Sequence, residues 1–246
     1  NINGDNQLKV LVVQPNVDPY SDKFTISYQQ QLDEFIALAR LKLNKETVLL
    51  VGPETGIQEG IWENRLETSY SVKALKELQK DFPNLNILVG ASTYKTFLTG
   101  ESKSATARKM ANKNIFYDAY NSAIFFPDTG QIMIYHKTKL VPGAEKIPFP
   151  VLFNKVSALS VDLGGVSGSL GSDNTLTTFD ILGANLLPLI CYESIYGELI
   201  KNKKADILCV ITNDGWWKNT AGHKQHFAYA RLRAVEQRKS IIRSAN

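Results

Sequence analysis

The apolar positions in the N-terminal part of the chain fall into short continuous runs, separated by segments with helical spacing. Apolar runs of about four to eight residues that end at Gly or Pro are typical of buried strands, whereas apolar positions at i, i+3 and i+4 indicate an amphipathic helix. These patterns predict strands at residues 8–14, 47–51 and 86–94, and helices at residues 27–43 and 66–82. Strands that alternate with helices are typical of an α/β layer.

The pattern changes in the middle of the chain, where strand follows strand without helices between them. Apolar runs predict strands at residues 115–126 and 131–137, and the intervening Pro-Asp-Thr-Gly is typical of a hairpin turn. A further strand is expected at residues 176–182. Residues 96–114 and 139–173 are rich in polar residues, Gly, Pro or Ser, so we expect them to form irregular surface segments.

The C-terminal part returns to alternating strands and helices. We expect strands at residues 184–190 and 205–212, a strand that begins at Ile241, and helices at residues 194–201 and 222–238. Two alternating halves that flank a hairpin predict two sheets packed face to face with helices outside. Because no repeat, linker or boundary interrupts this pattern, residues 1–246 are predicted to form a single domain.

The composition is that of an ordinary globular protein. Hydrophobic residues make up 43% of the chain and charged residues 21%, which excludes disordered and fibrous classes. The net charge of +4 comes from basic residues scattered along the chain, so we predict no nucleic-acid partner. No apolar run approaches the roughly 18 residues that cross a bilayer. The chain begins without methionine and ends inside a predicted strand, so we expect a domain excised from a longer protein.

The two cysteines are too few for a disulfide framework, and Cys209 lies in an apolar run typical of a core strand. Cys191 instead follows the predicted strand 184–190 directly and precedes a predicted helix. A thiol at this junction can meet the N–H groups of the helix, whose partial positive charge favours a thiolate. A free cysteine after an apolar run is also typical of a small buried hydrophobic residue, so both interpretations of Cys191 stay open.

Two charged residues supply the other parts of a nucleophilic site. Glu54 follows the strand at 47–51, at the sheet edge where α/β proteins bind ligands. Apolar surroundings would disfavour its charged form, so we expect a raised pKa and a base that works near neutral pH. Lys137 ends a hairpin strand and is expected to face inward. Glu54 would take the thiol proton, Cys191 would attack a carbonyl, and Lys137 would stabilise the oxyanion.

The local sequences around these three residues resemble the Glu-Lys-Cys triad of the nitrilase, or carbon–nitrogen hydrolase, superfamily. They are Gly-Pro-Glu-Thr at 52–55, His-Lys-Thr-Lys-Leu-Val-Pro at 136–142 and Ile-Cys-Tyr-Glu-Ser at 190–194. In the family pattern two residues separate the lysine of the triad from Leu-Val-Pro, and this spacing selects Lys137 over the neighbouring Lys139. Within the superfamily, Asn-Asp-Gly-Trp-Trp at 213–217 resembles the apolipoprotein N-acyltransferases, and the resemblance covers nearly the whole chain.

This resemblance implies a nitrilase-like four-layer α-β-β-α sandwich that forms the catalytic domain of a bacterial inner-membrane enzyme and faces the periplasm. Such an enzyme takes a fatty acyl chain from phospholipid as a cysteine thioester. It then passes the chain to the N-terminal α-amino group of a diacylglyceryl-cysteine lipoprotein. The implied partners are therefore a phospholipid acyl donor, a diacylglyceryl lipoprotein acceptor and the membrane surface, and no cofactor is implied.

The resemblance also implies supporting roles. Glu145 would orient Lys137, Glu193 would form the site wall behind the nucleophile, and the backbone N–H of Tyr192 would bind the oxyanion. The usual Leu-Val-Pro-Phe-Gly-Glu of the family is Leu-Val-Pro-Gly-Ala-Glu at residues 140–145, so an aromatic residue is missing beside the site.

Several aromatic residues admit two interpretations, as packing residues or as the lining of an acyl groove that also contacts the membrane interface. They are Trp62, Phe149, Trp216 and Trp217. His223 and His226 have helical spacing but no accompanying ligand, so we predict no metal site. Two other functions stay open. The first is a soluble amidase or nitrilase of the same superfamily that acts on a small amide, and the second is a catalytically silent interaction domain.

Overall fold

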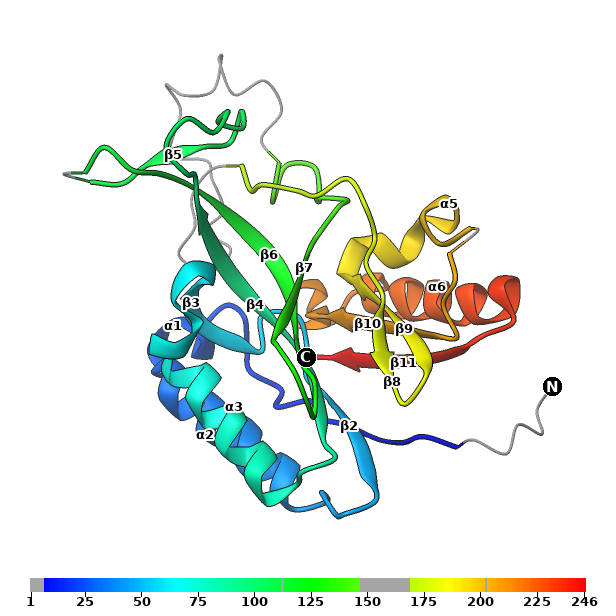
Figure 1. Ribbon diagram of the computed structural model, residues 1–246. Coiled ribbons are helices and arrows are strands. Elements are labelled where there is room, and N and C mark those ends of the chain that lie inside the picture. The colour runs from blue at the N-terminus through cyan, green and yellow to red at the C-terminus, as the bar shows by residue number, and fades with distance from the viewer. Residues whose placement is uncertain (1–6, 112, 147–168, 202) are drawn as a thin grey trace.

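Two β-sheets face each other in the computed structural model, and helices cover the outer face of each sheet (Figure 1). The structure describes residues 7–111, 113–146, 169–201 and 203–246. This arrangement of helices and two sheets is the predicted four-layer α-β-β-α sandwich.

The first sheet has the paired order β1-β2-β4-β6-β5, with β3 beside β4 and β7 beside β6. Strands β1, β2 and β4 are parallel, whereas β4, β6 and β7 are antiparallel. Its strands are β1 (Lys9–Val12), β2 (Thr47–Val51), β3 (Ile57–Trp62), β4 (Asn86–Thr96), β5 (Arg108–Lys109), β6 (Phe116–Phe126) and β7 (Met133–His136).

The second sheet has the order β11-β10-β9-β8. Strands β9, β10 and β11 are parallel, and β8 pairs with β9 in the antiparallel direction. Its strands are β8 (Phe179–Ile181), β9 (Ala184–Ile190), β10 (Ile207–Thr212) and β11 (Ser240–Ala245). Because β9, β10 and β11 are parallel, their carboxyl ends meet at one edge, and the residues that follow them become neighbours.

Strand side chains alternate between two apolar layers, as the pleat of a strand requires. In β9, Leu186 and Ile190 pack between the two sheets, whereas Leu187 and Leu189 pack toward the outer side. The layer between the sheets also contains Phe125 from the first sheet, stacked on Phe179 of the second with ring centroids 4.7 Å apart. A third apolar layer lies between the first sheet and its helices.

The α-helices are α1 (Asp22–Thr25), α2 (Tyr28–Arg40), α3 (Tyr70–Asp81), α5 (Gly197–Ile200) and α6 (Gly222–Gln237). Short 3₁₀ helices are η1 (Glu63–Thr68), η3 (Cys191–Ile195) and η4 (Asp214–Trp217). Ser27 begins α2 with a capping box, because its Oγ accepts from Gln30 N at 3.2 Å and its own N–H donates to Gln30 Oε1 at 3.3 Å. None of the helices in the described ranges is long and apolar enough to cross a membrane.

The observed elements depart from the predicted ones mainly at β3, which sequence patterns did not indicate. Its sequence Ile-Gln-Glu-Gly-Ile-Trp does not alternate cleanly and contains Gly60. Strands β2 and β3 pair in turn with successive parts of β4, so the segment between them forms a break that contains Glu54. Gly90 of β4 permits this break, because a Cβ there would lie 2.7 Å from the Cα of Glu54.

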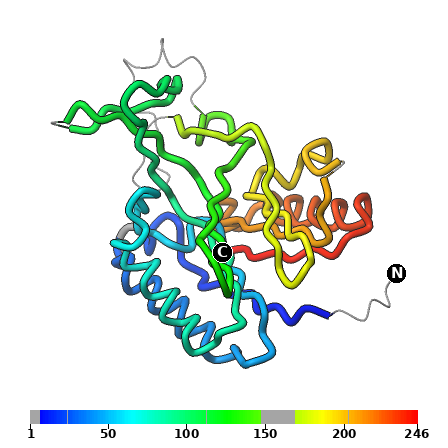
Figure 2. The backbone as a smooth tube through the Cα atoms, viewed as in Figure 1, coloured from blue at the N-terminus to red at the C-terminus, as the bar shows by residue number. Residues whose placement is uncertain are grey.

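The last strand, red in Figure 2, brings the C-terminal end of the chain beside the segment that follows β1. Asn246 Oδ1 accepts from Val17 N at 2.8 Å, and Ser244 Oγ donates to Val13 O at 3.0 Å. These contacts join the two sheets at the edge where Asn213 follows β10. The elements that surround the site are therefore held together by residues from both ends of the sequence.

Candidate active site

The ends of four strands converge on one cavity of about 290 Å³. Glu54 follows β2, Lys137 follows β7, Cys191 follows β9 and Asn213 follows β10. All four line the cavity, so the structure brings together the three residues that the sequence analysis selected. The remaining lining residues are Lys23, Thr55, Ser92, Asn121, Val141, Ala144, Glu145, Leu170, Trp216 and Trp217.

Glu54 is 7% exposed and is held by three donors. Its Oε1 accepts from Asn121 Nδ2 at 2.7 Å and from Lys137 Nζ at 3.2 Å, and its Oε2 accepts from Asn213 N at 3.1 Å. Burial by itself raises the pKa of Glu54, but Lys137 and the two hydrogen-bond donors together bring that pKa below its ordinary value. The predicted raised pKa is therefore wrong, and Glu54 is a carboxylate at neutral pH.

Lys137 is fully buried between two carboxylates. Its Nζ lies 3.2 Å from Glu54 Oε1 and 2.9 Å from Glu145 Oε1. Burial alone would lower the pKa of Lys137, but the neighbouring charges of Glu54 and Glu145 raise it above its ordinary value. The ammonium group stays charged and faces inward, where an oxyanion that forms in the cavity could contact it.

Glu145 and Asn121 complete this charged cluster. Glu145 Oε2 accepts from Val141 N at 2.8 Å, while its Oε1 accepts from Asn121 Nδ2 at 2.7 Å. Asn121 thus donates to both carboxylates that flank Lys137. Glu145 was expected beside Lys137, whereas Asn121 was not predicted as a site residue. A polar residue at a buried position of a predicted strand was the signal that could have identified Asn121.

Cys191 has a backbone φ of 49°, a left-handed conformation that is uncommon for residues other than Gly. Burial, and then the nearby carboxylate of Glu54, raise the pKa of the thiol, and the favourable effects of Lys137 and Thr212 do not offset them. The predicted thiolate is therefore wrong for the resting site, because only the short 3₁₀ helix η3 follows Cys191. A neutral thiol beside a carboxylate is nevertheless the arrangement that proton transfer to a general base requires.

Glu193 is fully buried and links the ends of β7 and β9. Its Oε1 accepts from the hydroxyl groups of Tyr135 at 2.6 Å and Thr138 at 2.7 Å, and from Thr138 N at 2.6 Å. Its Oε2 accepts from Ile190 N at 2.8 Å. Because these partners adjoin Lys137 and Cys191, Glu193 holds the strand ends that carry both residues. Tyr192 is half-buried, with its ring against Tyr196 at 5.1 Å.

Replacing Glu193 with Gln is expected to lower the free energy of unfolding by about 2–4 kcal/mol, because an NH₂ group would face buried N–H or O–H donors. Urea denaturation followed by circular dichroism measures this change. Glu198→Gln, on the exposed face of α5, is the matched control and should shift the free energy by less than about 0.5 kcal/mol. Equal stability of the two variants would contradict this structural role.

The predicted aromatic residues separate into two groups. Trp216 and Trp217 of η4 line the cavity, and Trp216 packs edge-on against Tyr20 at 5.2 Å. Trp62 does not line it, and instead packs against Tyr94 at 5.1 Å in an aromatic cluster. Phe149 lies outside the described residues. The cavity also contains Lys23, whose ammonium lies 5.4 Å from the Trp216 ring and which no sequence pattern indicated.

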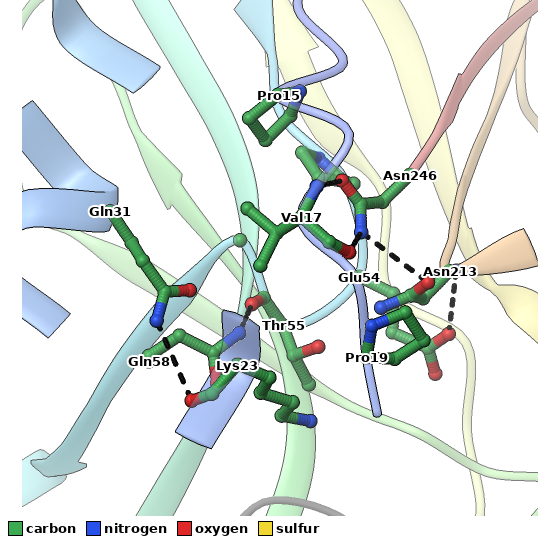
Figure 3. Close-up of a pocket in the computed structure, with 12 residues that line it drawn as sticks. Pro15, Val17, Pro19, Lys23, Gln31, Glu54, Thr55, Gln58, Asn213 and Asn246 are labelled. Carbon is green, nitrogen blue, oxygen red and sulfur yellow. Dashed lines mark hydrogen bonds between the residues drawn. The ribbon is translucent and has the colours of Figure 1, made fainter. Parts of the chain in front are cut away.

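A second, much smaller pocket lies behind Glu54 (Figure 3). Its volume of about 10 Å³ is close to the minimum for one water molecule. The close-up shows Pro19, Asn213 and Asn246 gathered around Glu54 on this side. Glu54 therefore lines both this small pocket and the large cavity.

His136 anchors the wall of the cavity from outside. Its Nε2 lies 2.6 Å from Glu63 and its Nδ1 lies 3.2 Å from Asp173. Burial lowers the pKa of His136, but these two carboxylates outweigh that effect and raise it to about 9. The charged imidazolium ties Asp173 to β7, close to Leu170, which lines the cavity and donates its N–H to Glu145 O at 2.9 Å. Among the described residues, no group of His, Cys, Asp and Glu could hold a metal ion.

Comparison with known sequences places this site in a family. An apolipoprotein N-acyltransferase from Chlorobaculum tepidum is 29% identical over 99% of this chain, and one from Rhizobium rhizogenes is 41% identical over 52% of it. These alignments cover 46% and 24% of the two relatives, so the chain spans less than half the length of each.

Solved structures with the same fold include the amidase from Nesterenkonia sp., with a TM-score of 0.61 at 13% identity, covering 97% of this chain and 75% of that chain. A cysteine-to-alanine mutant of the Nesterenkonia AN1 amidase, described as a member of the nitrilase superfamily, has a TM-score of 0.60 at 13% identity over 97% of this chain and 76% of that one. At such identity the likeness concerns the fold alone, and it confirms the predicted nitrilase-like sandwich.

The family model of the carbon-nitrogen hydrolases matches residues 10–246. The chain therefore belongs to the carbon–nitrogen hydrolase family.

Proposed function

We propose that this chain is the catalytic domain of an N-acyltransferase that moves a fatty acyl chain from phospholipid to the N-terminal α-amino group of a diacylglyceryl-cysteine lipoprotein. The observation that carries the proposal is the convergence of Glu54, Lys137 and Cys191 on a cavity walled by Leu170, Trp216 and other apolar residues. The names of the relatives from Chlorobaculum tepidum and Rhizobium rhizogenes support the substrate class.

The first half-reaction forms a thioester. Glu54 takes the proton from the Cys191 thiol, and the thiolate attacks the ester carbonyl of the phospholipid. The oxyanion lies near the Lys137 ammonium and, as the resemblance implies, the backbone N–H of Tyr192. Collapse of the tetrahedral intermediate breaks the ester C–O bond, and the lysophospholipid alkoxide leaves with the proton that Glu54 holds.

The second half-reaction forms an amide. The neutral α-amino group of the lipoprotein attacks the thioester carbonyl and gives its surplus proton to Glu54. The intermediate collapses with cleavage of the C–S bond, and the thiolate recovers the proton from Glu54. The same carboxylate therefore serves as base and then as acid in each half-reaction, and the lowered pKa of Glu54 means that it starts in its ionised form.

The membrane location belongs to the same proposal. A phospholipid donor and a lipid-modified acceptor both lie in a bilayer, so the cavity must open toward one. Trp217, which is 45% exposed at the cavity, has the amphipathic ring that favours a membrane interface. We place the domain at the bacterial inner membrane, facing the periplasm.

Mass spectrometry of Cys191 tests the proposal. The chain, expressed with whatever precedes and follows it in its gene, is incubated with phospholipid vesicles and digested. A long-chain acyl adduct is expected on Cys191, with none on Cys209 and none in a Cys191→Ser variant. Release of ammonia from a small amide without any acyl adduct would instead assign the chain as an amidase. If neither an acyl adduct nor ammonia forms, and cellular function stays normal after replacement of Cys191, the result would favour a silent interaction domain.

A further inference from the structure

A second polar network, distinct from the cluster of Glu54, Lys137 and Glu145, adjoins Cys191. Strands β9 and β10 are parallel with Ile190 opposite Ile211, so the next residues, Cys191 and Thr212, become neighbours at the strand ends. Thr212 is fully buried, and its hydroxyl group lies close enough to the Cys191 thiol to favour the thiolate. Sequence patterns did not select Thr212, since a threonine at the end of an apolar strand is common.

The network continues from Thr212 and returns to the same cysteine. Thr212 Oγ1 donates to Asp214 Oδ1 at 3.2 Å, and this oxygen lies 3.0 Å from His226 Nδ1. His226 Nε2 in turn lies 3.0 Å from the carbonyl oxygen of Cys191. Arg243 forms an ion pair with the other oxygen of Asp214. A chain of contacts that starts at Thr212, beside the sulfur of Cys191, therefore ends at the carbonyl of the same residue.

This chain suits the strained backbone of Cys191. A left-handed conformation in a residue other than Gly persists only where its surroundings hold it. The carbonyl of Cys191 is held by His226 and also by Ser194 Oγ, which donates to it at 2.8 Å. His226 thus contacts Asp214 with one ring nitrogen and the carbonyl of Cys191 with the other.

We propose that the Thr212 hydroxyl is the hydrogen-bond donor that stabilises the Cys191 thiolate during the reaction, and that Asp214, oriented by His226 and Arg243, positions this hydroxyl. The inference rests on the proposed role of Cys191 as nucleophile. As the donor to the reacting sulfur, Thr212 would be a catalytic residue, whereas Asp214, His226 and Arg243 are positioning residues.

The single hydroxyl proton explains how the pair works. At rest the hydroxyl group of Thr212 donates its proton to Asp214 and so donates nothing to the neutral thiol. When Glu54 removes the thiol proton, the hydroxyl rotates and donates to the sulfur anion. Asp214 tolerates this loss because His226 and Arg243 continue to satisfy it. The donor therefore reaches the sulfur when the negative charge forms, which stabilises the thiolate and not the thiol.

Other charged groups also face Cys191, and the test must leave them unchanged. Glu54 and Glu145 disfavour the thiolate, and Lys137 favours it. Asp214 and His226 lie one hydrogen bond farther away, on η4 and α6. Thr212→Val removes only the hydroxyl and keeps the branched shape of the side chain, so it alters none of these charges.

Alkylation of Cys191 by iodoacetamide as a function of pH tests the proposal without any acyl substrate. We expect Thr212→Val to displace the pH profile of the rate to higher pH and to slow alkylation about tenfold at a given pH below the thiol pKa. Thr212→Ser, which restores a hydroxyl, should return the rate to within about threefold of the unchanged chain. Thr47→Val removes another buried threonine hydroxyl, far from the site, and should leave the profile unchanged.

Peptide mass spectrometry follows the alkylation of Cys191 and Cys209 separately. Cys209 is fully buried in β10 and reacts only when the sheet opens, so its alkylation reports on folding. If Thr212→Val is partly unfolded, Cys209 becomes reactive in that variant. In that case the alkylation rates of Cys191 in Thr212→Ala and Thr212→Ser are compared instead. An unchanged pH profile in the valine or alanine variant, or a serine variant as slow as either, would overturn the proposal. Because no phospholipid is used, either result is independent of the acyl-transfer assignment.

Discussion

Replacing Glu54 with glutamine is expected to slow the acylation of Cys191 by about 10²–10⁴-fold, the usual contribution of a general base. Glutamine preserves the shape of the side chain and retains one oxygen for Asn121 or Lys137, but it cannot accept a proton. Single-turnover incubation with phospholipid, followed by mass spectrometry of Cys191, measures the rate. Glu46→Gln, which changes an exposed carboxylate, is the control. A Glu54→Gln rate within about threefold of the control would exclude Glu54 as the base.

The pH dependence of the same reaction gives an independent check. The pKa of Glu54 is lowered in the folded chain, so its carboxylate form persists below the ordinary titration range of glutamate. The pKa of Cys191 is raised, so the thiol stays protonated well above neutral pH. The active pair, a Glu54 carboxylate and a Cys191 thiol, therefore exists from mildly acidic to alkaline pH. The rate should be flat across neutral pH and should fall only when acid protonates Glu54.

Replacing Lys137 with methionine is expected to lower both activity and stability. Acylation of Cys191 should slow by about 10²–10³-fold, because the oxyanion loses a charged donor. The free energy of unfolding should fall by about 3–5 kcal/mol, because methionine fills the space but leaves two buried carboxylates without their shared cation. Lys139→Met is the matched control, since Lys139 is exposed two positions later in the chain. If Lys137→Met and Lys139→Met had the same acylation rate and the same free energy of unfolding, the proposed role of the buried Lys137 would be contradicted.

The sign of the stability effect with pH distinguishes this explanation from a simple packing defect. Without Lys137, burial raises the pKa of Glu54 in the folded state above its unfolded value. A group of this kind contributes stability below its unfolded pKa and loses that contribution as the pH rises. Lys137→Met should therefore be relatively more stable at pH 5 than at pH 8 in urea denaturation. A stability loss that is the same at both pH values would indicate lost packing alone.

The fold was predictable because hydrophobic periodicity reports which faces of an element are buried. Strands such as β9 and β10 are continuous apolar runs, since both faces are covered in a four-layer sandwich. The short strand β5 and the glycine-containing β3 lack this signal, because their pairing depends on the neighbouring strands β6 and β4. Periodicity reports burial and carries no information about such dependent pairings.

The candidate site was predictable to a similar extent. Glu54, Lys137 and Cys191 each follow a strand, and strand ends gather at the edge where α/β proteins bind ligands. Lys23 and Thr212 were not selected, because nothing in their local sequence distinguishes them from ordinary surface or strand residues. Asn121 was not selected either, although it is a polar residue in a predicted strand. All three belong to the site only because the middle of β6, helix α1 and the end of β10 lie beside it.

The sequence by itself determined the strands, the helices, the family resemblance and the three residues proposed for the chemistry, because these depend on local patterns and short motifs. Only the tertiary structure decided their protonation states. Burial raises the pKa of both Glu54 and Cys191, yet Lys137, Asn121 and Asn213 reverse the effect for Glu54 and not for the thiol. The sign of each pKa shift is a sum over neighbours from distant parts of the chain, and folding alone brings those neighbours within a few ångströms of one another.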